Sequence, residues 1–190
     1  MKLSKKQQIE HKAKDLFWKY GFKKVTIEEI CKKANVSRKT FYTLYENKSA
    51  LVIFLLKEMT DEMMMTYNDI IESQNSFSEK LEKMLLLKSE SSNQFSMEFV
   101  ADFFHPDSED ILAYYSQIMQ ESLSLTTKFF LNAQQKGEMN PELDINFVMA
   151  MMQKISEVCS TPEMMSMFKD AETMTRQISQ LLIFGVMPPK

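Results

Sequence analysis

Apolar side chains recur every three or four residues along most of the chain, which is the pattern of amphipathic helices rather than of strands. The first clear stripe contains Ile9, Ala13, Phe17 and Tyr20. Gly21 follows directly, and glycine can adopt the left-handed conformation that closes a helix. With only 3 glycines and 5 prolines in 190 residues, helix breakers are rare. These features predict an all-α protein whose first helix ends near residue 20.

Two short helices are predicted next. Thr26 and Glu29 have the spacing of a capping box, in which each side chain bonds the other residue's backbone N–H. Asn35 follows the second helix, and asparagine tolerates the positive φ that a tight turn can require. Ser37 is a suitable cap for a third helix. Residues 1–50 therefore have the pattern of a three-helix head that contains a helix–turn–helix.

The third helix has two different faces. Phe41, Leu44 and Tyr45 share one face and are expected to pack on the first two helices. The opposite face carries two cations, an aromatic ring and a hydroxyl: Arg38, Lys39, Tyr42 and Thr43. Arg and Lys can reach phosphates or guanine edges, hydroxyls can bond phosphate oxygens, and an aromatic ring can contact thymine methyl groups. A face that only contacts water would carry similar residues, so this local pattern alone does not distinguish a DNA-binding face from a solvated one.

The distribution of charge separates these two interpretations. Residues 1–50 contain 13 Lys and Arg but only 5 Asp and Glu, a formal charge of +8. The remaining 140 residues contain 10 Lys and Arg against 21 Asp and Glu, a formal charge of −11. A basic head on an acidic body indicates that the head binds a polyanion and that the body does not. Together with the helix–turn–helix pattern, this predicts binding of double-stranded DNA.

Several positions of the head also agree in order and spacing with a known DNA-binding module. They are Ala13, Phe17, Tyr20-Gly21-Phe22, Thr26-Ile27-Glu28-Glu29-Ile30, Ala34-Asn35-Val36-Ser37, Thr40-Phe41-Tyr42, Tyr45, Asn47-Lys48 and Leu51. On these residues, the segment 5–51 resembles the DNA-binding head of the tetracycline-repressor (TetR) family of transcriptional regulators. The resemblance implies DNA contacts from Thr26, Ser37, Arg38, Thr40, Tyr42 and Lys48.

Three positions depart from the pattern of that family. Asn35 replaces the usual glycine of the turn, which costs little because asparagine tolerates a positive φ. Lys39 stands where glycine is common and adds a cation to the face that would enter the groove. Leu44 replaces a frequent histidine and so removes a donor to phosphate. The operator sequence therefore cannot be carried over from the family.

The body, residues 51–190, continues the helical pattern and contains 16 of the 17 methionines. Ordinary core packing explains most of these side chains. A second hypothesis is a cavity for a small apolar or aromatic effector, because flexible Met side chains adjust to varied apolar ligands. The candidate lining residues are Met59, Met63, Tyr67, Met84, Phe99, Phe103, Tyr115 and Met119. Glu98 and Asp102 either attract a cationic ligand or face water.

The last two predicted helices carry more apolar surface than one subunit can cover. Residues 145–158 are apolar nearly all round their first two turns, and a long stripe follows Thr161-Pro162. The surplus predicts a homodimer in which two helices of each subunit form a four-helix interface. The candidate interface residues are Phe147, Met151, Ile155, Met167, Met174, Ile178 and Leu181. The family resemblance implies the same dimer.

The sequence offers no basis for catalysis or for a metal cofactor. No nucleophile–base pair, glycine-rich phosphate loop or metal-ligand spacing occurs, and the two cysteines and two histidines follow no metal motif. The first residues lack the apolar core of a secretory signal, and no apolar run is long enough for a membrane helix, so a cytoplasmic location is expected. An enzyme with an incidental basic face is the weakest alternative.

These observations predict a ligand-responsive transcriptional regulator with a DNA-binding domain at 1–50 and a ligand-binding and dimerisation domain at 51–190. The expected mechanism is repression at a palindromic operator, with residues 38–43 in the major groove and release by a small apolar effector. The alternative keeps the same head but replaces the small molecule with a protein partner, or gives the protein an architectural role on DNA.

Overall fold

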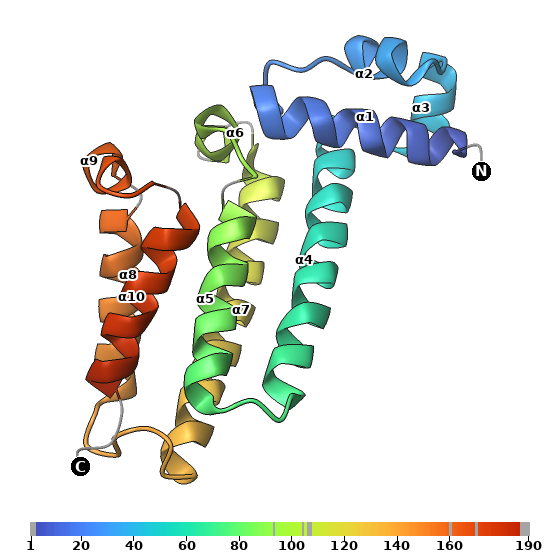
Figure 1. Cartoon of the computed structure of the whole chain (residues 1–190). Coiled ribbons are helices and arrows are strands. Elements are labelled where there is room, and N and C mark those ends of the chain that lie inside the picture. Colours follow the sequence, from blue (N-terminus) through green and yellow to red (C-terminus); the bar gives the residue numbers. More distant parts are fainter. Residues whose placement is uncertain are drawn as a thin grey trace. The chain divides into compact units, whose positions relative to one another are not determined.

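The computed structural model describes residues 3–92, 94–103, 105, 108–159, 161–169 and 171–186, and every regular element within these ranges is a helix (Figure 1). This confirms the predicted all-α class. The elements are α1 (Lys5–Tyr20), α2 (Ile27–Ala34), α3 (Arg38–Leu44), α4 (Lys48–Glu72), α5 (Phe77–Ser92), α6 (Met97–Asp102), α7 (Glu109–Gln135), α8 (Ile145–Cys159), α9 (Pro162–Ser166) and α10 (Ala171–Val186).

The helices group into two compact units. The first unit consists of Met1–Met63 and Ser92–Met119, and the second consists of Met64–Ser91 and Gln120–Lys190. The first unit therefore contains more than the predicted head, because the first part of α4, α6 and the start of α7 pack with it. The predicted division into a DNA-binding domain at 1–50 and a second domain at 51–190 is a division by function, and it remains a prediction.

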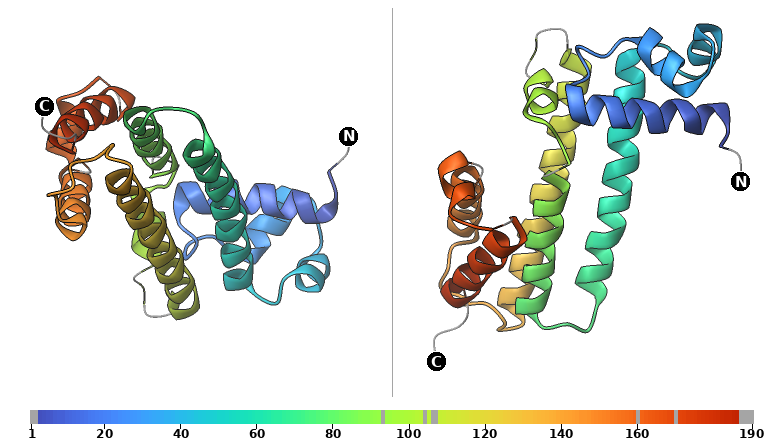
Figure 2. Two further views of the ribbon diagram at one scale, coloured as in Figure 1. Left: turned by 90° about the horizontal axis from the view of Figure 1, so that it is seen from below. Right: turned by 45° about the horizontal axis from the view of Figure 1, so that its top comes forward.

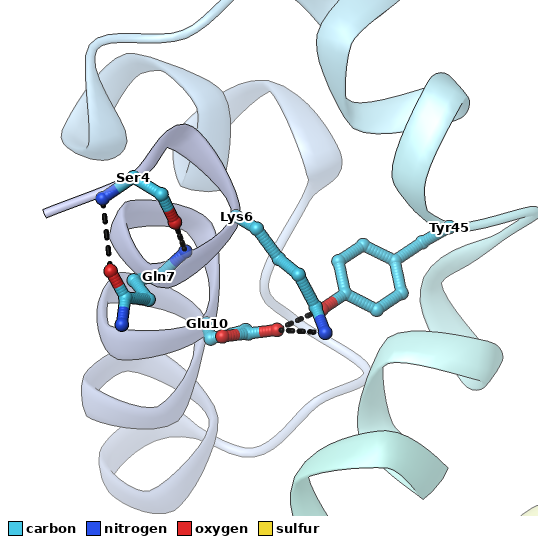
Figure 3. A network of polar contacts seen from close by, with 5 residues as sticks. All are labelled: Ser4, Lys6, Gln7, Glu10 and Tyr45. Atoms are coloured by element: carbon cyan, nitrogen blue, oxygen red, sulfur yellow. Dashed lines mark hydrogen bonds and ion pairs between the residues drawn. The ribbon is translucent and has the colours of Figure 1, made fainter.

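Local sequence signals determine where the helices of the head begin and end. Ser4 accepts from the Gln7 N–H while the Gln7 side chain accepts from the Ser4 N–H, so a capping box starts α1 (Figure 3). Thr26 and Glu29 form the predicted box at the start of α2. Gly21 ends α1 with φ 80° and ψ 152°, a combination outside the left-handed helical region and open essentially to glycine alone. The stop at Gly21 is confirmed, but its conformation differs from the expected one.

The core of the first unit lies where α1, α2, α3, α4 and α6 meet. Ile9, Phe17, Ile30, Phe41 and Leu51 are completely or almost completely buried there. Burying a side chain of this size stabilises a protein by about 1.5–3 kcal/mol. The stripes predicted on α1 and α2 are thus the faces that fix α3 to the rest of the head.

The second unit has a core of its own, built between α5, α7 and α8. Phe77 of α5 stacks on Phe129 of α7 with ring centroids 5.3 Å apart, and Met139 fills the turn that follows α7. Arg176 of α10 forms an ion pair with Glu82 of α5 at 2.9 Å. The stripe predicted after Thr161 is interrupted, because the chain leaves the helix after Ser166 and resumes it at Ala171 (Figure 2).

Candidate nucleic-acid interface

The helix–turn–helix is formed by α2 and α3. Asn35 ends α2 with φ 53°, which confirms the positive φ predicted for the turn, and the Val36 N–H donates to the Cys31 carbonyl at 3.0 Å. Ser37 caps α3 by accepting from the Thr40 N–H at 3.1 Å. Because the turn is this short, the direction of α3 is determined by α2 and by the side chains that α3 buries.

Two aromatic side chains attach α3 to the head. Phe41 is fully buried, and Tyr45 is nearly so. The Tyr45 hydroxyl donates to the Glu10 carboxylate of α1, which also forms an ion pair with Lys6 (Figure 3). Burial raises the pKa of Tyr45, and the hydrogen bond and negative charge of Glu10 raise it further. The sequence did not single out Glu10, because nothing in its spacing indicates a partner 35 positions away.

The opposite face of α3 is open to solvent. The four side chains expected on this face, Arg38, Lys39, Tyr42 and Thr43, are all exposed. Leu44 was expected to be buried beside Phe41, but it is 39% exposed. The reason is that α3 ends at Leu44, so this side chain lies at the edge of the helix and beyond the packed face.

Arg38 is already paired in the absence of DNA. Its guanidinium forms an ion pair with Glu28 of α2 and lies over the ring of Tyr42, 5.9 Å from the centroid. The Tyr42 hydroxyl and then the Glu28 charge raise the pKa of Arg38, so this side chain stays cationic at any physiological pH. Both members of the ion pair are exposed, and exposed pairs contribute little to stability. A phosphate or a guanine edge can therefore replace Glu28 at low cost.

The hydroxyl groups of the predicted interface also serve the helices. The Thr26 hydroxyl accepts from the Glu29 N–H. The Thr26 backbone N–H and then its hydroxyl donate to the Glu29 carboxylate, which lowers the pKa of Glu29. The Ser37 and Thr40 hydroxyls bond each other, and Thr43 donates to the Lys39 carbonyl at 2.8 Å. Each hydroxyl oxygen keeps acceptor capacity, so DNA contacts from these residues stay a prediction.

Lys48 has a different environment from the one expected of a phosphate ligand. Its ammonium donates to the carbonyl oxygens of Lys23 at 3.2 Å and of Val25 at 2.9 Å. Burial lowers the pKa of Lys48, and the neighbouring Lys23 charge adds to this effect. Two of its three N–H groups are thus used inside the protein, because two loop carbonyls outside any helix need donors. The sequence could not show this, because every residue has a backbone carbonyl and the residue type does not indicate which carbonyls need a donor.

Asp102 is half-buried and contacts the backbone of the head. Its carboxylate accepts a hydrogen bond from the Lys23 backbone N–H at 2.8 Å, so this residue of α6 contacts the loop between α1 and α2. Glu98, one turn earlier on α6, is exposed as expected. The hydrogen bond to Lys23 is a role of Asp102 that neither alternative considered from the sequence included.

Comparisons with known proteins agree with this geometry. Residues 9–53, which include the whole helix–turn–helix, match the bacterial regulatory proteins of the tetR family. The head of this chain, residues 9–53, is thus of the tetR type. An uncharacterized HTH-type transcriptional regulator of Bacillus subtilis, YdgC, is 23% identical over 174 residues, covering 88% of this chain and 85% of that protein. TetR-family proteins of this kind are transcriptional regulators.

Two solved structures extend the likeness to the whole TetR-type fold. The fatty acid degradation regulator FadR from Bacillus halodurans is 20% identical, with a TM-score of 0.77 and coverage of 97% of both chains. FadR from Bacillus subtilis, solved in complex with stearoyl-CoA, is also 20% identical, with a TM-score of 0.76 and coverage of 94% of this chain and 97% of that one. At this level of identity, the likeness concerns the fold alone.

The residues proposed to line an effector cavity fall in both compact units. In the first unit, Phe99 and Phe103 are buried against Trp18 and Phe22 of the head, so their rings belong to the core of that unit. Tyr115 packs on Phe103, 4.7 Å between centroids. The other three first-unit candidates are less enclosed: Met59 and Met63 are half-buried and Met119 is exposed.

The second unit contains the other two candidates. Met84 is buried in the core, and Tyr67 packs against that core from α4. Within the described residues, the Tyr67 hydroxyl is buried with no hydrogen bond of good geometry. Burial raises its pKa, while the nearby Thr126 hydroxyl opposes the shift. This buried hydroxyl makes Tyr67 a candidate polar contact for a ligand.

The seven residues expected at a dimer interface divide into two groups. Phe147, Met151, Met167 and Leu181 are exposed, as an unformed interface requires, and Ile155 and Ile178 are partly buried. Met174 is only 8% exposed, and Thr175 and Ser179 of the same helix are also buried, so Met174 belongs to the subunit's own interior. We therefore remove Met174 from the expected interface.

Other classes of site find no support in the part of the chain that the structure describes. No group of three His, Cys, Asp or Glu side chains in these ranges is placed to hold a metal ion. Cys31 is a buried free thiol, and the side chain of Cys159 lies outside the described atoms. None of the described helices combines the length and apolar character that crossing a bilayer requires.

Proposed function

We propose that this chain is a dimeric, ligand-responsive repressor that binds a palindromic operator through α3 and is released by a small apolar effector. The exposed face of α3 carries the proposal. Arg38, Lys39 and Tyr42 project from a short helix that Phe41 and Tyr45 hold on the core of a TetR-type head. A helix of this kind fits the major groove, where its cations and ring reach base edges and phosphates.

Exposed apolar side chains on α8 and α10 support the dimer. Phe147 of α8 is 59% exposed and Leu181 of α10 is 71% exposed, while Met151 and Val158 add further apolar surface on α8. Apolar groups gathered on the surface of a soluble domain mark interaction sites. A two-fold dimer would present two copies of α3, and this matches an operator with two-fold symmetry.

An apolar effector is supported by the methionines of the body and by one structural neighbour. Met side chains adjust to ligands of different shape, and 16 of the 17 lie beyond residue 50. The Bacillus subtilis FadR of the same fold was solved with stearoyl-CoA, whose long acyl chain is apolar. Within the second compact unit, Met84 is a proposed apolar contact, and the buried Tyr67 hydroxyl is the proposed polar one.

The effector acts by favouring a conformation that binds the operator less tightly. A coupling free energy of about 1–3 kcal/mol between the two ligands changes DNA affinity about 5- to 150-fold. Because the coupling is reciprocal, operator DNA weakens effector binding by the same factor.

Two linked experiments test the proposal. Duplexes selected from a random library by the full-length protein should contain two inverted half-sites, whereas selection of no common sequence would contradict specific operator binding. Hydrophobic compounds, including long-chain acyl-CoA thioesters, are then screened for an increase in melting temperature. Compounds that stabilise the protein should weaken its binding to the selected duplex. Stabilisers that never change DNA affinity would contradict effector control and favour control by a protein partner.

A further inference from the structure

Helix α6 is attached to the head at both of its ends. At its start, the Ser96 N–H donates to the Trp18 carbonyl of α1 at 2.9 Å. At its end, the Asp102 carboxylate accepts from the Lys23 backbone N–H at 2.8 Å. Figures 1 and 2 show α6 beside the C-terminal end of α1, within the first compact unit. A helix of only six residues is thus fixed to the head by two backbone groups.

Aromatic rings fill the space between these two attachments. Phe99 of α6 lies 4.7 Å from the Trp18 ring and 5.7 Å from the Phe22 ring, measured between centroids. Phe103 contacts Phe22 at 5.7 Å and Tyr115 of α7 at 4.7 Å. All these side chains except Tyr115 are buried. Movement of α6 relative to α1 would therefore require several rings to repack, which makes the contact stiff.

Gly21 makes the close approach of α6 possible. A Cβ atom on Gly21 would lie 2.5 Å from Asp102 Oδ2 and 3.3 Å from the Glu98 carbonyl carbon. The backbone at Gly21 also has a φ of 80°, which side chains rarely allow. The chain can bring the Asp102 carboxylate against the head only where no side chain stands between them.

The loop between α1 and α2, residues 21–26, is also held from α4. Lys48, the first residue of α4, donates to the carbonyl oxygens of Lys23 and Val25. The backbone of Lys23 thus donates its N–H to α6 and accepts from α4 at its carbonyl. This loop leads directly into Thr26, the cap of the first helix of the helix–turn–helix.

We propose that Asp102 is a positioning residue for operator binding: with Lys48 it fixes the α1–α2 loop, and thereby the angle at which the helix–turn–helix is held against α4 and α6. Asp102 touches no DNA in this account. In a two-fold dimer, the angle of each head sets the distance between the two copies of α3. The spacing of half-sites in an operator reflects that distance. The inference rests on the dimeric, palindrome-binding function proposed above.

The Asp102 carboxylate also acts on Lys48, the second residue that holds the loop. The negative charge of Asp102 favours the charged form of Lys48, which opposes the effect of burial on that ammonium group. Removal of the carboxylate leaves the Lys23 N–H without this acceptor. It also removes a negative charge that favours the charged form of Lys48. Asp102→Ala therefore removes the restraint on Lys23 directly and affects Lys48 only indirectly, through the lost charge.

The test measures how DNA affinity depends on half-site spacing. The selected duplex is lengthened or shortened between its half-sites by one base pair at a time, and the full-length protein is titrated with each duplex. The unaltered protein should bind one spacing best. Asp102→Ala should bind that duplex roughly tenfold more weakly and should discriminate less among spacings, because a looser loop permits several head angles. Asp102→Asn, whose amide oxygen can still accept from Lys23, should largely retain the original profile.

Two further variants separate positioning from general destabilisation. Glu98→Ala removes the same charge from the exposed side of α6 and should leave the spacing profile unchanged. Asp102→Glu keeps the charge but moves the carboxylate by one methylene, so its preferred spacing should shift or broaden even if Asp102→Ala folds poorly. A change in stability alone would lower binding to all duplexes by one factor and leave their ranking intact.

The possible outcomes distinguish this inference from the function on which it rests. A sharp spacing profile that is identical in the unaltered protein, Asp102→Ala and Asp102→Glu overturns the positioning role alone. A flat profile in the unaltered protein overturns the palindromic operator and the positioning role together.

Discussion

The Arg38 guanidinium on α3 is paired with the Glu28 carboxylate on α2, so the first cation of the recognition helix has an anionic partner before any DNA is present. DNA must displace Glu28 to use Arg38 fully. We expect Glu28→Gln to strengthen binding of the selected duplex by roughly two- to fivefold at low salt, because it frees Arg38 and removes a charge that repels phosphate. Titrations at several salt concentrations measure this.

A charge-matched variant controls for the change in net charge. Asp15→Asn removes an exposed carboxylate from α1, where it pairs with Lys12 instead of with a residue of α3. If Asp15→Asn strengthened binding as much as Glu28→Gln, the effect would be one of overall charge, and the release of Arg38 would not be its cause.

The hydrogen bond from Tyr45 to Glu10 predicts a second effect, on stability. Tyr45→Phe should lower the free energy of unfolding by about 1–3 kcal/mol, because a partly buried carboxylate loses its donor. Tyr42→Phe is the matched control, since Tyr42 is exposed and its loss should hardly change the melting temperature. Denaturant titrations followed by circular dichroism compare the two variants. Equal melting of both variants would contradict a stabilising role for the bond to Glu10.

The raised pKa of Tyr45 gives this effect a pH dependence. A group whose pKa is higher in the folded state contributes stability that is complete below its unfolded pKa, here about 10, and is lost as the pH rises above it. The unaltered protein should therefore lose stability more steeply above pH 10 than Tyr45→Phe does. Parallel slopes for the two proteins between pH 9 and 11 would count against this assignment.

Much of the head was predictable because its signals are local. The capping box of Thr26 and Glu29, the turn at Asn35 and the burial of Phe41 each depend on residues within a few positions of one another, and all three are confirmed. The contacts of Lys48 and Asp102 could not be predicted, for the opposite reason. Their partners are backbone groups of a loop 23 to 79 positions away, and backbone groups are the same for every residue type.

Lys48 therefore has a revised prediction. Lys48→Met should lower the melting temperature of the protein, because the carbonyl groups of Lys23 and Val25 lose a charged donor. Lys33→Met, at an exposed position near the end of α2, is the control and should leave the melting temperature nearly unchanged. A Lys48→Met protein that melts like its parent would show that the two carbonyl contacts do not stabilise the head.

The salt dependence of DNA binding then reports whether Lys48 also reaches phosphate. Its third N–H remains available for such a contact. If it makes one, the plot of log K against log salt should be less steep for Lys48→Met, with the magnitude of its slope reduced by about one. An unchanged slope with a lower melting temperature would assign Lys48 to the fold alone.

The proposed dimer is tested at positions where substitution spares the subunit's own core. Phe147→Glu and Leu181→Glu place charges on exposed side chains of α8 and α10, so each variant should fold but dissociate into monomers. Met65→Glu is the control, because Met65 of α4 is 70% exposed and lies outside the proposed interface. Light scattering at micromolar concentration gives the mass of each protein. Dimeric Phe147→Glu and Leu181→Glu proteins would exclude this surface as the interface.

The hydrogen bond between Asp102 and Lys23 joins residues 79 positions apart, and this separation has a consequence for the order of synthesis. The three helices of the head leave the ribosome well before α6 does. Until then, Trp18 and Phe22 lack Phe99 and Phe103 as packing partners. Contacts distant in sequence form late and leave apolar surface uncovered in the meantime. A nascent chain arrested before residue 92 should thus offer this aromatic surface to chaperones, whereas one arrested well beyond residue 119 should not.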